Sequence, residues 1–158
     1  MKRTLLSVLL FVCCLPALAQ HEAQVYTEND FQGQWKLVAY ITSDGTLNMN
    51  TGKAEADIKM KAKYGDAYAD EAIKKLEDEV EDLKQSYLEV SGKKFTLGLK
   101  DNVRSGTFKL KRDKDNNQVL VAKFKDNSQS TGHFVMKDND LVLTHYSGDK
   151  YIFEKKTD

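Results

Sequence analysis

The chain of 158 residues has only two cysteines and one proline, and these lie together at Cys13, Cys14 and Pro16. The sequence after Pro16 therefore offers no disulfide, no thiol nucleophile and no thiolate ligand for a metal ion. A chain of this length is most simply a single domain with one hydrophobic core. Because no covalent cross-link is available, that core has to hold the fold.

Long hydrophobic runs are also missing, since no apolar run approaches the roughly 20 residues that a membrane-spanning helix needs. The longest lies within residues 5–15; it follows two basic residues and precedes a proline and the sequence ALA at 17–19. This order is typical of a secretory signal peptide. We expect residues 1–19 to be a signal peptide that is cleaved after Ala19, leaving residues 20–158 as the exported domain.

A lipid anchor on Cys13 or Cys14 is the alternative to simple cleavage. Such anchoring signals have small residues before the cysteine, whereas Phe11 and Val12 are large, so cleavage is favoured. A secreted domain without disulfides suits a bacterial periplasm better than a small disulfide-rich extracellular module. We therefore expect a secreted, most simply periplasmic, protein without stable membrane insertion.

The expected mature chain has no excess of positive charge. Removal of residues 1–19 leaves 22 basic and 24 acidic side chains. Nucleic acid is not expected as a partner, because phosphate binding needs a net basic face. The segment 53–86 has 10 acidic and 7 basic residues, whereas 87–158 has 10 acidic and 14 basic. We expect the acidic segment to lie against the basic one.

Signatures of catalysis are absent from the sequence. It contains no Gly-x-Ser-x-Gly turn, no His-Glu-x-x-His helix and no glycine-rich phosphate loop. Its many carboxylates fall on predicted turns and helix surface, where nothing distinguishes a general acid from a general base. The sequence thus predicts a protein that is not an enzyme, and it implies no cofactor.

The second half of the chain alternates between apolar and polar residues. Six runs of strand length are separated by short segments rich in Asp, Asn, Gly and Ser, which suit tight turns. Such short connections indicate an antiparallel meander. With the run at 87–92 and the strand that contains Trp35, the sequence predicts a mainly β fold, a single up-and-down antiparallel β-barrel of about eight strands.

A different pattern separates the Trp35 strand from the meander. Apolar residues there recur at spacings of three and four, which places on one helix face Ile73, Leu76, Val80, Leu83 and Tyr87. Gly65 should divide the helical segment, with Asp66 or Asp70 as a cap. We expect an amphipathic helical insert over about residues 54–86. The favoured interpretation is a cover over one end or side of the barrel; a mobile lid and a coiled-coil dimer are the alternatives.

The single tryptophan lies two residues after Gly33 in the run FQGQWKLVAY, residues 31–40. Strict alternation places Trp35, Leu37, Ala39 and Ile41 on one face of this strand and Lys36, Val38 and Tyr40 on the other. A large indole beside a glycine can plug the closed end of a barrel. As a core residue, Trp35 can fill this role without contact to any ligand.

The pattern Phe31-x-Gly33-x-Trp35-Lys36-Leu37-Val38 resembles the first-strand signature of the calycin superfamily, which includes the lipocalins and fatty-acid-binding proteins. It is most similar to bacterial secreted lipocalin-like domains, and the order of Gly-x-Trp strand, helical insert and meander extends the resemblance over most of residues 20–158. The resemblance implies non-enzymatic binding of a small hydrophobic or amphipathic ligand in the barrel. The chain departs from these families in having no Thr-Asp-Tyr motif and no Arg-x-Tyr pair near its end. No arginine on the last strands can stack on Trp35, and Lys155 and Lys156 are the nearest basic residues.

The expected ligand-binding positions are the side chains that alternation and the resemblance direct into the barrel. They are Trp35, Leu37, Phe95, Leu97, Phe108, Leu110, Arg112, Leu120, Phe124, Phe134, Leu143, Tyr151 and Phe153. Arg112 is the polar member, because it shares strand parity with Phe108 and Leu110 and can reach a ligand carboxylate from the rim. The apolar members form a cavity wall or fill the interior. A filled barrel would instead act as a periplasmic protein–protein interaction module.

Two further polar groupings are weighed as metal sites. His133 and His145 should face each other across a hairpin whose loop is 138–140, but no third ligand occurs at a telling spacing. The run DKDNNQ at 113–118 begins like a calcium loop, yet it lacks the glycine at its sixth position and the closing glutamate. We expect a hairpin turn there and no metal site at either place.

Overall fold

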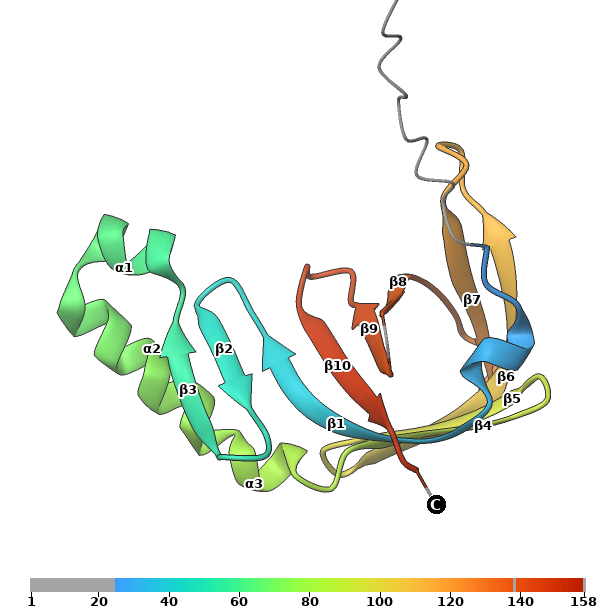
Figure 1. Ribbon diagram of the computed structural model, residues 1–158, viewed down its shortest axis with the longest axis horizontal. Coiled ribbons are helices and arrows are strands. Elements are labelled where there is room, and N and C mark those ends of the chain that lie inside the picture. Colours follow the sequence, from blue (N-terminus) through green and yellow to red (C-terminus); the bar gives the residue numbers. More distant parts are fainter. Residues whose placement is uncertain (1–24, 138, 158) are drawn as a thin grey trace, which may run out of the picture.

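The computed structural model describes residues 25–137 and 139–157; the expected signal peptide lies outside these residues. The structure is a closed antiparallel barrel of eight strands with a helical lobe beside it (Figure 1). This confirms the predicted fold class. The barrel strands are β1 (Gly33–Ile41), β4 (Tyr87–Ser91), β5 (Lys94–Leu99), β6 (Asn102–Arg112), β7 (Gln118–Phe124), β8 (Gln129–Lys137), β9 (Asp140–Thr144) and β10 (Lys150–Lys155).

Closure depends on β1, which pairs with β10 on one edge and with two strands in turn on the other. Its first half, residues 33–36, pairs with β4, and its second half, residues 39–41, pairs with β2 (Gly45–Asn48). From there β2 and β3 (Lys53–Ala56) continue as a hairpin outside the ring. The alternation rule anticipated the barrel strands. It did not anticipate β3, whose residues were assigned to the helical insert. These residues form a strand because they pair with β2 along its whole length.

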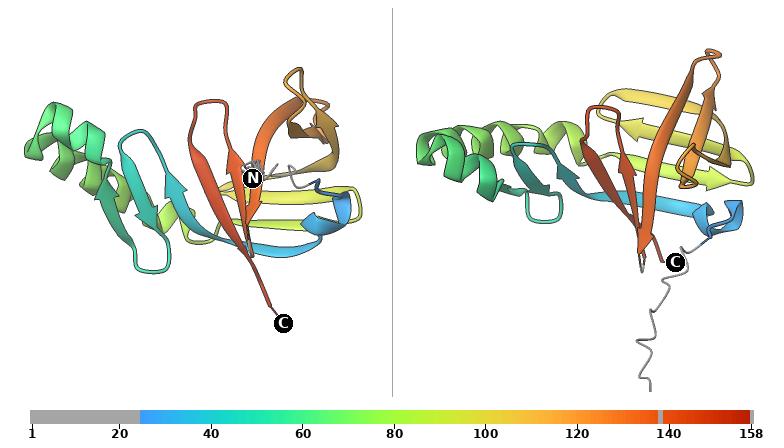
Figure 2. Two further views of the ribbon diagram at one scale, coloured as in Figure 1. Left: turned by 45° about the horizontal axis from the view of Figure 1, so that its top comes forward. Right: turned by 90° about the horizontal axis from the view of Figure 1, so that it is seen from above.

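Three helices follow the hairpin: α1 (Ile58–Tyr64), α2 (Asp66–Asp78) and α3 (Val80–Leu83). In both Figure 1 and Figure 2 these helices lie to one side of the barrel. There α2 packs against β2 and β3. The helices thus cover the hairpin at the side of the barrel, and no helix of the described residues lies across the barrel mouth. An ion pair between Lys100 and Glu79 joins the β5–β6 turn, in the net basic segment 87–158, to the acidic helical segment.

Gly65 divides the helical segment as the sequence predicts, because its φ of 86° lies in the region that favours glycine. The predicted caps are wrong. Asp57 caps α1 by accepting hydrogen bonds from the amides of Lys59 and Met60, at 2.9 and 3.0 Å. Asp66 is already the first residue of α2, whose cap position is Gly65 itself and has no side-chain hydrogen bond.

One end of the barrel is closed by η1 (Glu28–Phe31), a short 3₁₀ helix that precedes β1. Its Phe31 is buried, with its ring centre 5.6 Å from that of Phe108 and 5.0 Å from that of Phe134. The indole of Trp35 donates a hydrogen bond of 2.9 Å to the carbonyl oxygen of Phe31. The ammonium of Lys155 lies 5.4 Å from the indole centre, where a cation is favourable. Trp35 therefore holds the plug in place from within the core.

A β-bulge in β1 corrects the predicted faces of this strand. The pairing with β10 shifts by one residue between Leu37 and Ala39, which places Tyr40 directly opposite Tyr151. One inserted residue reverses the alternation that follows it. Tyr40, and not Ala39 or Ile41, therefore shares the face of Leu37 beyond the bulge, and its ring stacks on that of Tyr151 with a centre separation of 5.0 Å.

Two glycines on neighbouring parts of the sheet provide a test of the strand packing. A Cβ at Gly106 would lie 2.1 Å from the carbonyl oxygen of Lys123, whereas a Cβ at Gly132 would lie 3.6 Å from that of Thr144. We expect Gly106→Ala to lower the free energy of unfolding by more than about 2 kcal/mol, because two backbones must separate. Gly132→Ala should change it by less than about 1 kcal/mol. Urea unfolding followed by Trp35 fluorescence measures both, and equal effects would contradict the observed strand approach.

Candidate functional site

The interior of the barrel contains a cavity of about 150 Å³ with a mostly apolar wall. It extends from Phe31 at the closed end to the β9–β10 turn, where Tyr146 is 92% exposed. The cavity therefore reaches the surface at the end of the barrel opposite to η1. This end, formed by the β5–β6, β7–β8 and β9–β10 turns, is called the open end below.

Eight of the thirteen predicted interior residues line this cavity. They are Phe95, Leu97, Phe108, Leu120, Phe124, Leu143, Tyr151 and Phe153. Each comes from a strand between β5 and β10 whose alternation is uninterrupted where the residue lies. The structure thus brings these side chains together around one space.

The other five predicted residues lie elsewhere. Trp35, Leu37 and Phe134 are buried in the core without lining the cavity, and Leu110 is half-buried against the same core. Arg112 is exposed and donates a hydrogen bond of 2.7 Å to the carbonyl oxygen of Asn116 in the β6–β7 turn.

Arg112 belongs to the closed end of the barrel. It pairs with Gln118 on β7, and the Gln118 side chain both accepts from the amide of Tyr26, at 2.7 Å, and donates to its carbonyl oxygen, at 2.9 Å. Tyr26 immediately precedes the capping residue of η1. The structure thus places Arg112 at the end opposite to the opening of the cavity, because strand parity gives the face of a residue and not the end of the barrel at which it lies.

Several cavity residues were missed by the sequence reasoning. Leu88 and Val90 alternate on β4, so the pattern that identified this strand also contained the signal for them. Leu99 continues the alternation of Phe95 and Leu97 on β5 and was missed in the same way. By contrast, Phe31 lies on η1, outside any strand, and His145 and Tyr146 lie in the β9–β10 turn. Alternation carries no information about such positions.

The two histidines do not face each other. Lys137 pairs with Asp140, so His133 lies opposite Thr144 and not opposite His145. Nδ1 of His145 is 2.9 Å from the Ser147 hydroxyl, which itself donates to Asp149 at 2.7 Å. In the described part of the chain, no cluster of three or more His, Cys, Asp or Glu side chains could hold a metal ion.

The segment 113–118 contains a hairpin turn, as predicted. One carboxylate oxygen of Asp113 accepts from the amides of Asp115 and Asn117, both at 2.9 Å, and Asn116 adopts a φ of 65°. The hydrogen bond from the Asn117 amide holds the pKa of Asp113 below its usual range. The Asp113 carboxylate thus stabilises the turn by accepting hydrogen bonds from its backbone amides.

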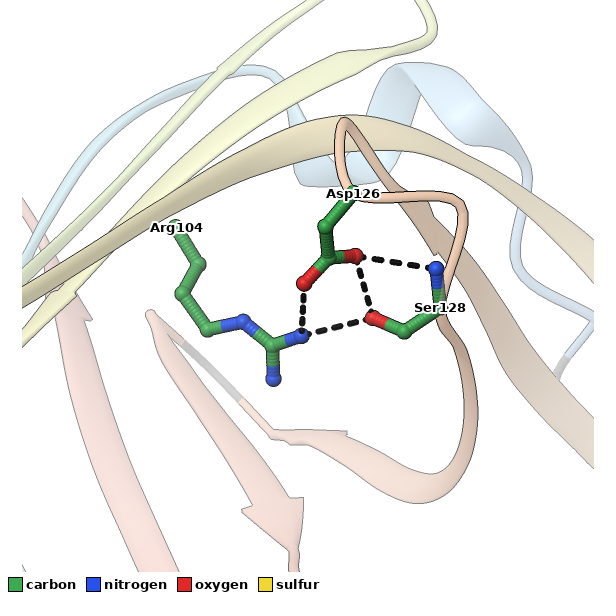
Figure 3. A network of polar contacts seen from close by, with 3 residues as sticks. All are labelled: Arg104, Asp126 and Ser128. Carbon is green, nitrogen blue, oxygen red and sulfur yellow. Dashed lines mark hydrogen bonds and ion pairs between the residues drawn. The ribbon is translucent and has the colours of Figure 1, made fainter.

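A polar group lies at the open end beside the cavity wall (Figure 3). Arg104 on β6 pairs with the cavity residue Leu97, and its guanidinium carbon is 3.6 Å from the centre of the Phe124 ring. Nη2 of Arg104 donates to the Ser128 hydroxyl at 2.7 Å and to Asp126 at the longer distance of 3.4 Å. Arg104 has the same strand parity as Phe108 and Arg112, so the sequence pattern contained a signal for it that was not used.

Asp126 is held mainly by its own turn. Its carboxylate accepts from the hydroxyl and from the amide of Ser128. These hydrogen bonds, and to a smaller extent the charge of Arg104, hold the pKa of Asp126 below its usual range. Asp126 therefore stays ionised independently of its contact with Arg104.

Comparison of the chain with models of known protein families, with curated proteins and with solved structures found no match. The class of protein is therefore defined by the fold and the cavity: an eight-stranded antiparallel barrel, with helices after its first strands and an apolar interior space. This arrangement is consistent with a calycin-like barrel. Among the described residues, no helix has the length and apolar character that crossing a membrane requires.

Tyr40 provides a test of the packing at the open end. Burial raises the pKa of Tyr40 well above its usual value, with Tyr151 contributing further. Because the neutral phenol is favoured in the fold, its stabilising contribution is complete below about pH 10 and is lost as the pH rises further. The free energy of unfolding of the wild type should therefore fall as the pH rises above about 10. We expect Tyr40→Phe to make this fall less steep, by up to about 1.4 kcal/mol per pH unit. Urea unfolding between pH 9 and 12 measures this, and a wild-type slope in the variant would contradict the burial of this hydroxyl.

Proposed function

We propose that this chain is a secreted lipocalin-like protein that binds a small hydrophobic or amphipathic molecule in its barrel without converting it chemically. The observation that supports this most directly is the apolar cavity, which opens at one end of a closed barrel and is plugged at the other. Ligand sites of this kind are concave and mostly apolar, with few polar groups. The resemblance at Gly33 and Trp35 supports the same proposal.

The size of the cavity limits what it can enclose. A dry cavity of about 150 Å³ with apolar walls is large enough for benzene, whereas drug-sized ligands use about 300–1,000 Å³. The space in this barrel is therefore suited to a ligand segment of about six carbon atoms. A longer chain would extend through the open end, past Tyr146 and the β9–β10 turn.

The driving force would be the removal of apolar surface from water. Burial stabilises by about 0.8 kcal/mol for each CH₂ group, so six carbons contribute roughly 5 kcal/mol before the cost of immobilisation is subtracted. Binding of a short chain alone should therefore be weak. A ligand that binds tightly needs an additional contact at the open end.

The proposed binding uses no catalytic group and no cofactor. We further propose that the protein is exported, on the sequence of residues 1–19. A periplasmic location agrees with a domain that depends on its core alone. Neither nucleic acid nor stable insertion into a membrane is part of the proposal.

Filling the cavity tests the proposed function. Ala122 lines the cavity and is 6% exposed, whereas the adjacent Val121 does not line it. We expect wild-type protein to bind 1-octanol saturably, and Ala122→Leu to weaken this binding at least tenfold, because the added carbons occupy the ligand space. Val121→Leu, on the other face of β7, should bind like the wild type. Perturbation of backbone amide resonances during titration measures the affinities.

The unfolding free energies of both variants serve as the control for folding. Absence of saturable octanol binding by the wild type would contradict the proposal. It would favour instead a filled barrel that acts as a protein–protein interaction module. Octanol binding that Ala122→Leu leaves unchanged would place the ligand outside the barrel.

A further inference from the structure

We propose that Arg104 binds the carboxylate head group of an amphipathic ligand whose apolar chain occupies the barrel cavity. This inference rests on the proposed function and adds to it the chemical class of the ligand. It assigns the charged contact to Arg104 at the open end, a residue that was not among the ligand-binding positions expected from the sequence.

The position of Arg104 is the first argument. Arg104 pairs with Leu97, and its guanidinium lies over the face of the Phe124 ring; both of these neighbours line the cavity. The Phe124 ring in turn contacts that of Phe95, deeper in the wall, with ring centres 5.4 Å apart. The guanidinium therefore lies next to the part of the cavity wall that Phe124 forms, and Figure 3 shows it beside the turn that carries Asp126 and Ser128.

The free hydrogen-bond donors of Arg104 are the second argument. A guanidinium has five N–H donors, and the contacts of Arg104 with Asp126 and Ser128 all use Nη2. Among the described residues, no hydrogen bond to Nε or Nη1 of Arg104 is present. The side chain is 40% exposed, so these donors are accessible to a carboxylate at the mouth of the cavity.

The weak hold of Asp126 on Arg104 is the third argument. The Asp126 contact is 3.4 Å long, and this carboxylate already has two partners in Ser128. A ligand carboxylate can therefore take Nη1 and displace Asp126 from Nη2, which gives a pair of parallel charge-assisted hydrogen bonds. Lys100, in the β5–β6 turn at the same end, is engaged with Glu79 and is less available.

The experiment compares octanoate with 1-octanol, which share an eight-carbon chain and differ in head-group charge. We expect the wild type to bind octanoate more tightly than octanol. Arg104→Gln should weaken octanoate binding about tenfold or more and leave octanol binding within a factor of two. Asp126→Asn should strengthen octanoate binding severalfold, because it removes the competing carboxylate while its amide oxygen can still accept from Ser128.

Arg112→Gln is the matched control, since Arg112 lies on the same strand with the same parity at the closed end of the barrel. It should leave both affinities unchanged. Octanol binding in each variant shows that its barrel is folded and its cavity intact.

The outcomes separate this inference from the proposed function. If octanol binds but Arg104→Gln leaves octanoate binding unchanged, the inference is overturned and the proposed function stands. The same holds if Asp126→Asn fails to strengthen octanoate binding. If neither compound binds to the wild type, the proposed function fails and the inference falls with it.

Discussion

The pairing of β10 with β1 is the constraint on which the rest of the structure depends. It joins the two ends of the meander, so that every strand of the ring has two neighbours. A ring of eight strands is just wide enough for its inward side chains to fill it or to hold one small ligand. Because the described barrel has no disulfide to hold it, this pairing and the core beneath it carry the fold.

Closure also gives the barrel two different ends. At one end Phe31 and Trp35 are fully buried, and the ammonium of Lys155 lies near the indole, where the family resemblance would have an arginine. At the other end the apolar cavity opens, and Arg104 lies there over the ring of the wall residue Phe124 and in contact with Asp126. The cavity thus reaches the surface at one end of the barrel and is closed by a packed plug at the other. The helical lobe leaves this mouth uncovered.

Alternation predicted the eight-stranded barrel and eight residues of the cavity wall, because a period of two directs every second residue inward. The prediction was wrong where a bulge interrupts this period, and where the pairing partner or the register of a strand, which the period does not specify, decides the structure. The bulge in β1 turned Tyr40 inward, the pairing of β2 recruited residues 53–56 into a strand, and a shift of one residue separated His133 from His145. Strand parity also left open at which end of the barrel Arg112 lies, and the arrangement of the turns places it at the closed end.

Native mass spectrometry most directly tests the proposal that this barrel carries a small apolar or amphipathic molecule. The protein would be purified gently from the cells that produce it, and a second sample would be incubated with extracted lipids. The account predicts one additional mass per chain, small enough to fit the cavity with its head group at the mouth, and released by organic solvent. A bare chain in both samples would contradict the account.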